Sequence, residues 1–172
     1  MNLTHWPNWT RLTGLLVLLS PAACGQGTLS CSNVRLQNAL ITDCSGEPVG
    51  GPNYAMDIRV MNPQTKSFDG SVLQVTATTN QPLKRIIVLT GKNHGRFSAG
   101  TLLVPFVAPG AEATVELRAW DKSTGTGFDA AKIRGSSVFK IRLGGAGQPP
   151  SMPGTMTEFT GIKVCPVTPP SK

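Results

Sequence analysis

Catalytic chemistry has few candidate residues in this sequence. Only two histidines occur among its 172 residues, His5 and His94, and His5 falls within the expected leader described below. A serine or cysteine nucleophile needs a positioned base, and no motif marks a partner for His94. The sequence contains no Gly-x-Ser-x-Gly turn, no His-Glu-x-x-His helix and no phosphate-binding glycine loop. We therefore predict a protein that is not an enzyme and that has no catalytic site, metal site or cofactor.

A second group of residues has side chains suited to binding a ligand. Arg118, Lys140 and Arg142 belong to two segments in which apolar and polar residues alternate, and we expect them to point outward on neighbouring strands. A positive patch of this kind attracts polyanions. Trp120 falls on the outward register as well, where an exposed ring could stack on a sugar. The interpretation that we favour is that Trp120 packs under the following loop, against Phe128.

The first 25 residues have the layout of a secretory signal peptide. Arg11 supplies a positive charge, Leu12–Leu19 is a short apolar run, and small residues lead to Gly25. The run is much shorter than the ~20 residues that a membrane-spanning helix needs, so no transmembrane segment is predicted. We expect a secreted or periplasmic protein that begins near residue 26. The alternative is a lipid anchor on Cys24, although Pro21 stands where lipoprotein signals usually have leucine.

Cysteine usage fits an oxidising compartment. The four cysteines are Cys24, Cys31, Cys44 and Cys165, with no Cys-x-x-Cys pair among them. In an exported protein this pattern favours disulfides over zinc binding. Removal of Cys24 with the leader leaves three. Our first choice for a bridge is Cys31–Cys44, because two neighbouring short strands could bring these residues together, and the alternative is Cys31–Cys165.

Short alternating runs separated by turn residues predict an all-β protein. The chain contains 19 glycines and 14 prolines, and only 15% of its residues are charged. The clearest run places Val115 and Leu117 on one face and Glu116 on the other, as in a strand with one buried face. A continuous apolar run at Arg85–Thr90 predicts a central strand, whereas Pro105 predicts an edge or bulge for its segment. The expected strands are Thr28–Val34, Leu36–Thr42, Tyr54–Met61, Ser71–Thr79, Arg85–Thr90, Thr101–Val107, Ala113–Trp120, Ser137–Leu143 and Phe159–Val164.

Strands at this spacing suggest a single antiparallel β-sandwich. We expect about eight or nine strands over residues 26–165, in an immunoglobulin-like or jelly-roll-like arrangement. Residues 166–172 are expected to form a flexible tail. No internal repeat or domain linker is visible.

Several short motifs carry a resemblance to a known group of proteins. The sequence resembles a family of exported, uncharacterised β-rich proteins of verrucomicrobial-type bacteria over most of residues 26–164, with Asn62–Lys92 departing from the pattern. The resemblance implies export and a β-rich fold, and no activity. Members often end in a C-terminal sorting helix with a basic tail, a feature that this sequence lacks. The matching motifs are Gln26-Gly27-Thr28, Gly51-Pro52-Asn53-Tyr54-Ala55, Gly100-Thr101, Val107-Ala108-Pro109-Gly110, Leu117-Arg118-Ala119-Trp120-Asp121, Gly135-Ser136-Ser137 with Phe139, and the glycine-rich run to Pro149-Pro150.

The charge balance narrows the choice of partner. With 16 basic and 9 acidic residues the chain carries a net charge of +7. It has no nucleic-acid-binding motif, and export favours an acidic polysaccharide or another anionic envelope polymer over nucleic acid. We therefore predict a secreted, non-catalytic binding protein or a structural protein of the envelope or matrix. The alternatives are a carbohydrate-binding module and a hydrolase with an unrecognised site. The sequence does not indicate an oligomeric state.

Overall fold

The computed structural model describes residues 26–68, 73–75, 80–83, 86–145 and 149–167. The expected leader with Cys24, most of the predicted strand at residues 71–79, and residues 168–172 of the predicted tail therefore lie outside the described residues. Regular structure within the described ranges consists of twelve short strands and one 3₁₀ turn, η1 (Gly91–Asn93). The prediction of an all-β protein is confirmed.

One five-stranded sheet, here called sheet C, contains the most regular strands. Its order is β12 (Cys165–Pro166), β9 (Ile133–Arg142), β8 (Glu112–Asp121), β3 (Tyr54–Val60) and β6 (Ile86–Ile87). All four pairings in it are antiparallel. The strands that carry Arg118 and the Lys140/Arg142 pair are therefore direct neighbours, as predicted.

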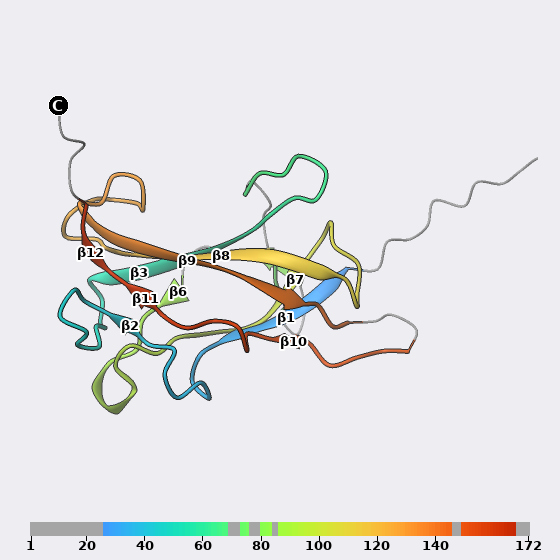
Figure 1. Cartoon of the computed structure of the whole chain (residues 1–172), viewed down its shortest axis with the longest axis horizontal. Coiled ribbons are helices and arrows are strands. Elements are labelled where there is room, and N and C mark those ends of the chain that lie inside the picture. The colour runs from blue at the N-terminus through green and yellow to red at the C-terminus, as the bar shows by residue number, and fades with distance from the viewer. Residues whose placement is uncertain (1–25, 69–72, 76–79, 84–85, 146–148, 168–172) are drawn as a thin grey trace, which may run out of the picture.

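A second five-stranded sheet, sheet A, lies across the core from sheet C (Figure 1). Its order is β10 (Gly154–Thr155), β1 (Gly27–Ser32), β7 (Ser98–Val104), β4 (Leu73–Val75) and β5 (Asn80–Pro82). A two-stranded sheet B pairs β2 (Ile41–Thr42) with β11 (Ile162–Lys163). The β1–β10 and β2–β11 pairings are parallel, so the arrangement departs from the purely antiparallel one that we predicted.

The two five-stranded sheets share one hydrophobic core. On β8, Val115 and Leu117 are fully buried, and they meet Leu29 and Leu102 of sheet A in one cluster. Phe139 of β9 packs on Phe159, with ring centroids 5.5 Å apart. The predicted faces of β8 and β9 are confirmed, because Val115 and Leu117 are buried while Glu116 is not, and Lys140 and Arg142 are exposed.

Three strand predictions are wrong in ways that have physical reasons. The run Arg85–Thr90 yields only β6, at the edge of sheet C, with Ile87 65% exposed. Periodicity cannot separate an apolar edge from a buried centre in so short a run. β7 lies inside sheet A, because Pro105 comes just after its last residue and removes no ladder hydrogen bond. Of the predicted strand Leu36–Thr42, only β2 forms.

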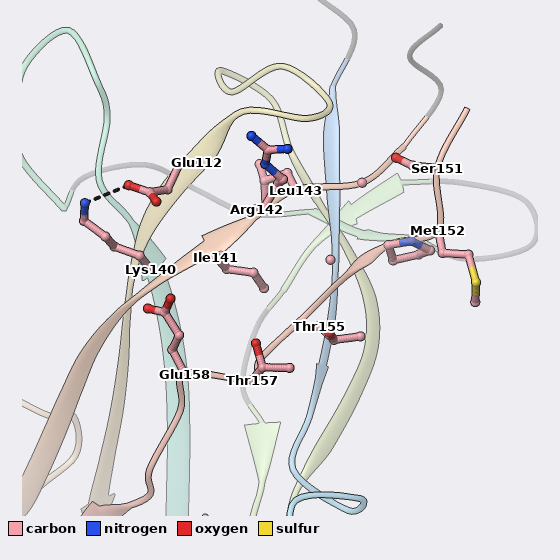
Figure 2. A pocket seen from close by; sticks show the side chains of 13 residues that line it. Glu112, Lys140, Ile141, Arg142, Leu143, Ser151, Met152, Thr155, Thr157 and Glu158 are labelled. Atoms are coloured by element: carbon pink, nitrogen blue, oxygen red, sulfur yellow. Dashed lines mark ion pairs between the residues drawn. The ribbon is translucent and has the colours of Figure 1, made fainter. Parts of the chain in front are cut away.

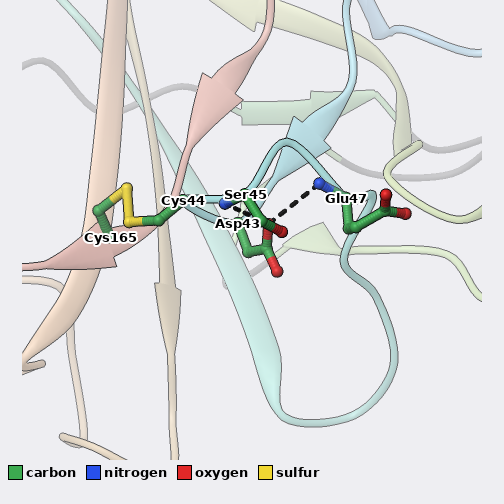
Figure 3. The surroundings of a disulfide bond; sticks show 5 residues. All are labelled: Asp43, Cys44, Ser45, Glu47 and Cys165. Atoms are coloured by element: carbon green, nitrogen blue, oxygen red, sulfur yellow. Dashed lines mark hydrogen bonds between the residues drawn. A yellow bond between two sulfur atoms is a disulfide. The ribbon is translucent and has the colours of Figure 1, made fainter.

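The disulfide joins Cys44 to Cys165, with Cα atoms 5.3 Å apart (Figure 3). Both predicted pairings, Cys31–Cys44 and Cys31–Cys165, are therefore wrong. Cys31 lies on the inward face of β1 and is fully buried as a free thiol. Because β2 pairs with β11 instead of with β1, the turn after β2 reaches the last strands of the chain.

An Asx turn holds the backbone beside this disulfide. Asp43 Oδ1 accepts hydrogen bonds from Ser45 Oγ at 2.6 Å, from Ser45 N at 2.9 Å and from Glu47 N at 3.0 Å (Figure 3). The hydrogen bond from the Ser45 side chain is the main reason that the pKa of Asp43 lies below its usual value. The turn thus fixes the position from which Cys44 meets Cys165.

Candidate functional site

The four predicted ligand-surface residues separate into two groups. Arg118 and Trp120 lie beneath the loop that follows β8, in a small cluster on the outer face of sheet C. Lys140 and Arg142 line an open groove at the end of β9. The structure therefore does not form one continuous basic patch from these residues.

The outward prediction for Arg118 needs correction. Arg118 is only 8% exposed. It donates from Nε to Asp57 Oδ1 at 2.7 Å and also forms an ion pair with that carboxylate through Nη2. This hydrogen bond is the main reason that the pKa of Arg118 is raised. The Arg118 side chain does project from the outward face of β8, but the loop that follows β8 covers it.

Phe128 brings that loop down onto sheet C. Its ring meets Trp120 edge-on, with centroids 6.4 Å apart, and the guanidinium groups of Arg118 and Arg134 lie 4.7 and 5.1 Å from its centroid. Trp120 is 3% exposed. The prediction that Trp120 packs under the loop against Phe128 is confirmed, and the alternative of an exposed Trp120 sugar platform is wrong.

The groove at the end of β9 is built by two close backbone approaches. Gly144 lies against the carbonyl oxygen of Met152, and Gly154 against the carbonyl oxygen of Arg142; a Cβ at either glycine would overlap that oxygen. Only glycine permits such contact. Gly145 and Ser151 close the connection with two hydrogen bonds of 3.0 and 3.1 Å. These contacts fix residues 151–158 as a wall opposite the end of β9.

Charged and hydroxyl side chains face this groove, which has a volume of about 510 Å³ (Figure 2). Lys140 Nζ and Glu112 Oε1 are 2.7 Å apart, and their hydrogen bond is the main reason that the pKa of Lys140 is raised. Arg142 stands opposite Glu112 in the strand register, but among the described residues it forms no ion pair within 4.0 Å. The wall contributes the hydroxyls of Ser151, Thr155 and Thr157, together with Glu158.

This arrangement suits a ligand that carries both a carboxylate and several hydroxyl groups. A guanidinium recognises a carboxylate through two parallel hydrogen bonds, and Arg142 is placed to do so. Serine and threonine hydroxyls can donate or accept, and carboxylates accept from hydroxyls. Glu112 and Glu158 offset the charges of Lys140 and Arg142 in the groove, so recognition of a carboxylate there depends on the guanidinium of Arg142 and not on a net positive charge.

Sequence reasoning found two cations of this groove and missed its far wall. Residues 144–157 have no periodicity, and their composition predicts only a loop. The available signal was the pair of glycines at 144 and 154 on either side of prolines, which permits two close approaches. His94 follows η1, is exposed and does not line the groove.

Comparison of the chain with protein-family models, with curated proteins and with solved structures finds no significant match. Within the described ranges, no three or more histidine, cysteine or acidic side chains gather as a metal site would require. The same ranges hold no helix with the length and apolar character needed to cross a membrane.

Proposed function

We propose that this protein is an exported, non-catalytic binding protein whose groove at the end of β9 takes an acidic polysaccharide built from sugar acids. The observation that carries the proposal is Arg142, a cation without an ion-pair partner among the described residues, which lines the same groove as three hydroxyl side chains. One carboxylate and several hydroxyls are what a sugar-acid residue presents. Residues 1–25 contain one basic residue, Arg11, and no acidic residue, so the exported protein keeps a net charge of +6, which adds a long-range attraction for such a polymer.

The same proposal covers export and architecture. Residues 1–25 direct secretion to the periplasm or beyond, and the resemblance to exported verrucomicrobial-type proteins supports the same route. The Cys44–Cys165 disulfide is consistent with an oxidising compartment. The two five-stranded sheets form the faces of one sandwich, with sheet B at its side. A role as an envelope or matrix component follows if the bound polysaccharide belongs to that structure.

Binding to a matched pair of polymers tests the proposal. The purified protein should bind polygalacturonate and should bind its fully methyl-esterified form at least ten times more weakly, because esterification removes the carboxylate charge and keeps the sugar backbone. Arg142→Ala should weaken binding of polygalacturonate about tenfold, the equivalent of one charge-assisted hydrogen-bonded pair. Lys92→Ala, which removes the same charge from the exposed η1 turn, should change it less than twofold. Equal binding of the two polymers, or unchanged binding by Arg142→Ala, would refute the proposal.

A hydrolase is the second candidate, because Glu112 and Glu158 both line the groove and glycosidases use two carboxylates. Both residues are exposed, however, whereas a carboxyl group that donates a proton at neutral pH usually lies in apolar surroundings. We therefore expect no reducing ends to be released from polygalacturonate during long incubation. Release that is abolished by Glu158→Gln would favour the hydrolase.

A further inference from the structure

A second hollow adjoins the groove on the other side of β10. It has a volume of about 400 Å³ and shares Thr155 with the groove. Thr155 stands beside Ser30 in the parallel β1–β10 register, and Ser30 stands opposite Thr101 of β7. The two hollows are therefore adjacent surfaces separated by one exposed strand of two residues. The lining of the second hollow is Ser30, Ser32, Val34, Arg35, Leu36, Ser98, Thr155 and Met156.

The chemistry of the second hollow resembles that of the groove. Arg35 is exposed, and among the described residues it forms no ion pair within 4.0 Å. Ser30, Ser32 and Ser98 line the same hollow. The Ser32 hydroxyl already donates to Phe97 O at 3.2 Å and accepts from Val34 N at 3.3 Å, which leaves Ser30 and Ser98 to face a ligand. Each hollow thus combines one guanidinium with several hydroxyls. A repeating ligand would therefore meet a guanidinium with neighbouring hydroxyls in each hollow.

The turn that carries Arg35 is held firmly by the fold. Asn33 is fully buried; its amide donates to Ala39 O at 2.6 Å and Gly95 O at 3.0 Å, and its Oδ1 accepts from Phe97 N at 2.6 Å. Arg96 Nη1 donates to the carbonyl oxygens of residues 33, 34 and 36 at 3.0 to 3.1 Å. Because these hydrogen bonds already fix the backbone of the turn, binding at Arg35 has to order only its exposed side chain.

We propose that the binding site continues from the groove across β10 into this second hollow, so that the ligand is a chain of several sugar acids. This inference rests on the proposed function and adds a second subsite with Arg35 as its anion-binding residue. Short fragments occupy the groove of Arg142. Longer chains pass over Thr155 and reach Arg35 as well. Linking two contacts in one ligand raises affinity because the second contact forms within the complex.

A length series of oligogalacturonates tests the extended site. In the protein without residues 1–25, affinity should rise from the dimer to the dodecamer at least tenfold beyond the increase that comes from the larger number of dimer-length registers in a longer chain. Arg35→Ala should remove most of that rise and leave affinity for the dimer within twofold, whereas Arg142→Ala should weaken binding of both. Lys92→Ala is the charge-matched control. Arg35→Lys should recover part of the rise, since it restores the charge without the planar fork.

The outcomes separate this inference from the proposed function. If the dimer binds through Arg142 but affinity does not rise with length, or if Arg35→Ala leaves the rise intact, the extended site is wrong and the groove remains. If no oligomer binds to the wild-type protein, both are wrong. An unchanged unfolding midpoint in Arg35→Ala shows that a lost rise reflects the exposed side chain and not a damaged fold.

Discussion

Removal of the Cys44–Cys165 disulfide should strongly destabilise the domain. The two cysteines are 121 residues apart, and in the chain-entropy description closing a loop of that size is worth about 5 kcal/mol. Measured losses for native disulfides are about 2–5 kcal/mol, against a total stability of about 5–15 kcal/mol for a typical domain. We therefore expect the double variant Cys44→Ala/Cys165→Ala to lose about 4 kcal/mol in free energy of unfolding.

Urea denaturation followed by tryptophan fluorescence measures this loss. With a urea dependence of about 2 kcal/mol per molar, the midpoint should fall by about 2 M. Wild-type protein treated with a reductant should show the same fall without any sequence change. A matched comparison is Cys31→Ala, which removes a buried thiol and keeps the bridge, so its midpoint should fall on reduction by as much as that of the wild type. The midpoint of the double variant Cys44→Ala/Cys165→Ala should not respond to the reductant.

Two results would refute this reasoning. A loss below about 1 kcal/mol in both the double variant and the reduced protein would mean that the bridge does not constrain the unfolded chain as the entropy description requires. Peptide mapping of the oxidised protein that places Cys31 in the disulfide would overturn the pairing. Burial raises the pKa of the Cys31 thiol to about 12, so a native Cys31 does not supply the thiolate that exchange needs.

Four further predictions address the core, the outer cluster and the turn. Leu117→Ala should cost about 2–5 kcal/mol in free energy of unfolding, and Glu116→Ala on the opposite face within about 0.5 kcal/mol; equal losses would mean that β8 is buried on both faces. Trp120→Ala should cost about 3 kcal/mol by loss of its contact with Phe128. Because Trp120 is the one tryptophan beyond residue 25, circular dichroism in urea measures this loss, and an unchanged midpoint would contradict that packing. Asn33→Ala should cost about 3 kcal/mol, because three backbone groups lose their partner; thermal unfolding checks this, and a loss below about 1 kcal/mol would count against it. The folded pKa of Cys31 lies above its unfolded value of 9.0, so the stability that the protonated thiol contributes is present below pH 9 and is lost as pH rises toward 12. Between pH 8 and 10 the wild type should lose about 1.4 kcal/mol in free energy of unfolding relative to Cys31→Ala, as measured by urea titrations of both proteins. The same pH dependence in both proteins would contradict this prediction.

The sequence predicts best where one face of a strand is buried and the other is wet. Val115 and Leu117 alternate with polar neighbours, and that contrast alone predicted which residues of β8 face the core. Trp120 could be placed correctly because the loop after it is long and carries Phe128. Arg118 could not be placed correctly, because its charge predicts exposure and no neighbouring residue in the sequence indicates that Asp57 of β3 stands opposite it.

Long-range pairing accounts for the remaining differences. Cys44 is near Cys31 in the sequence, yet its partner depends on β2 pairing with β11, a contact between distant segments. The groove likewise depends on residues 151–158 folding back onto the end of β9 through Gly144 and Gly154. Neither segment has periodicity, so no local pattern identifies its neighbour.

The disulfide also determines how the domain carries mechanical tension. For a pull applied between β1 and β12, the shortest covalent path runs through the Cys44–Cys165 bond and bypasses β3, β8 and β9. The covalent ring removes 121 residues from the extensible length, which at about 3.3–3.6 Å per residue is a contour of roughly 400 Å. While the bond is intact, such a pull cannot extend the residues between Cys44 and Cys165, and reduction of this one bond adds their full contour length to the stretched chain.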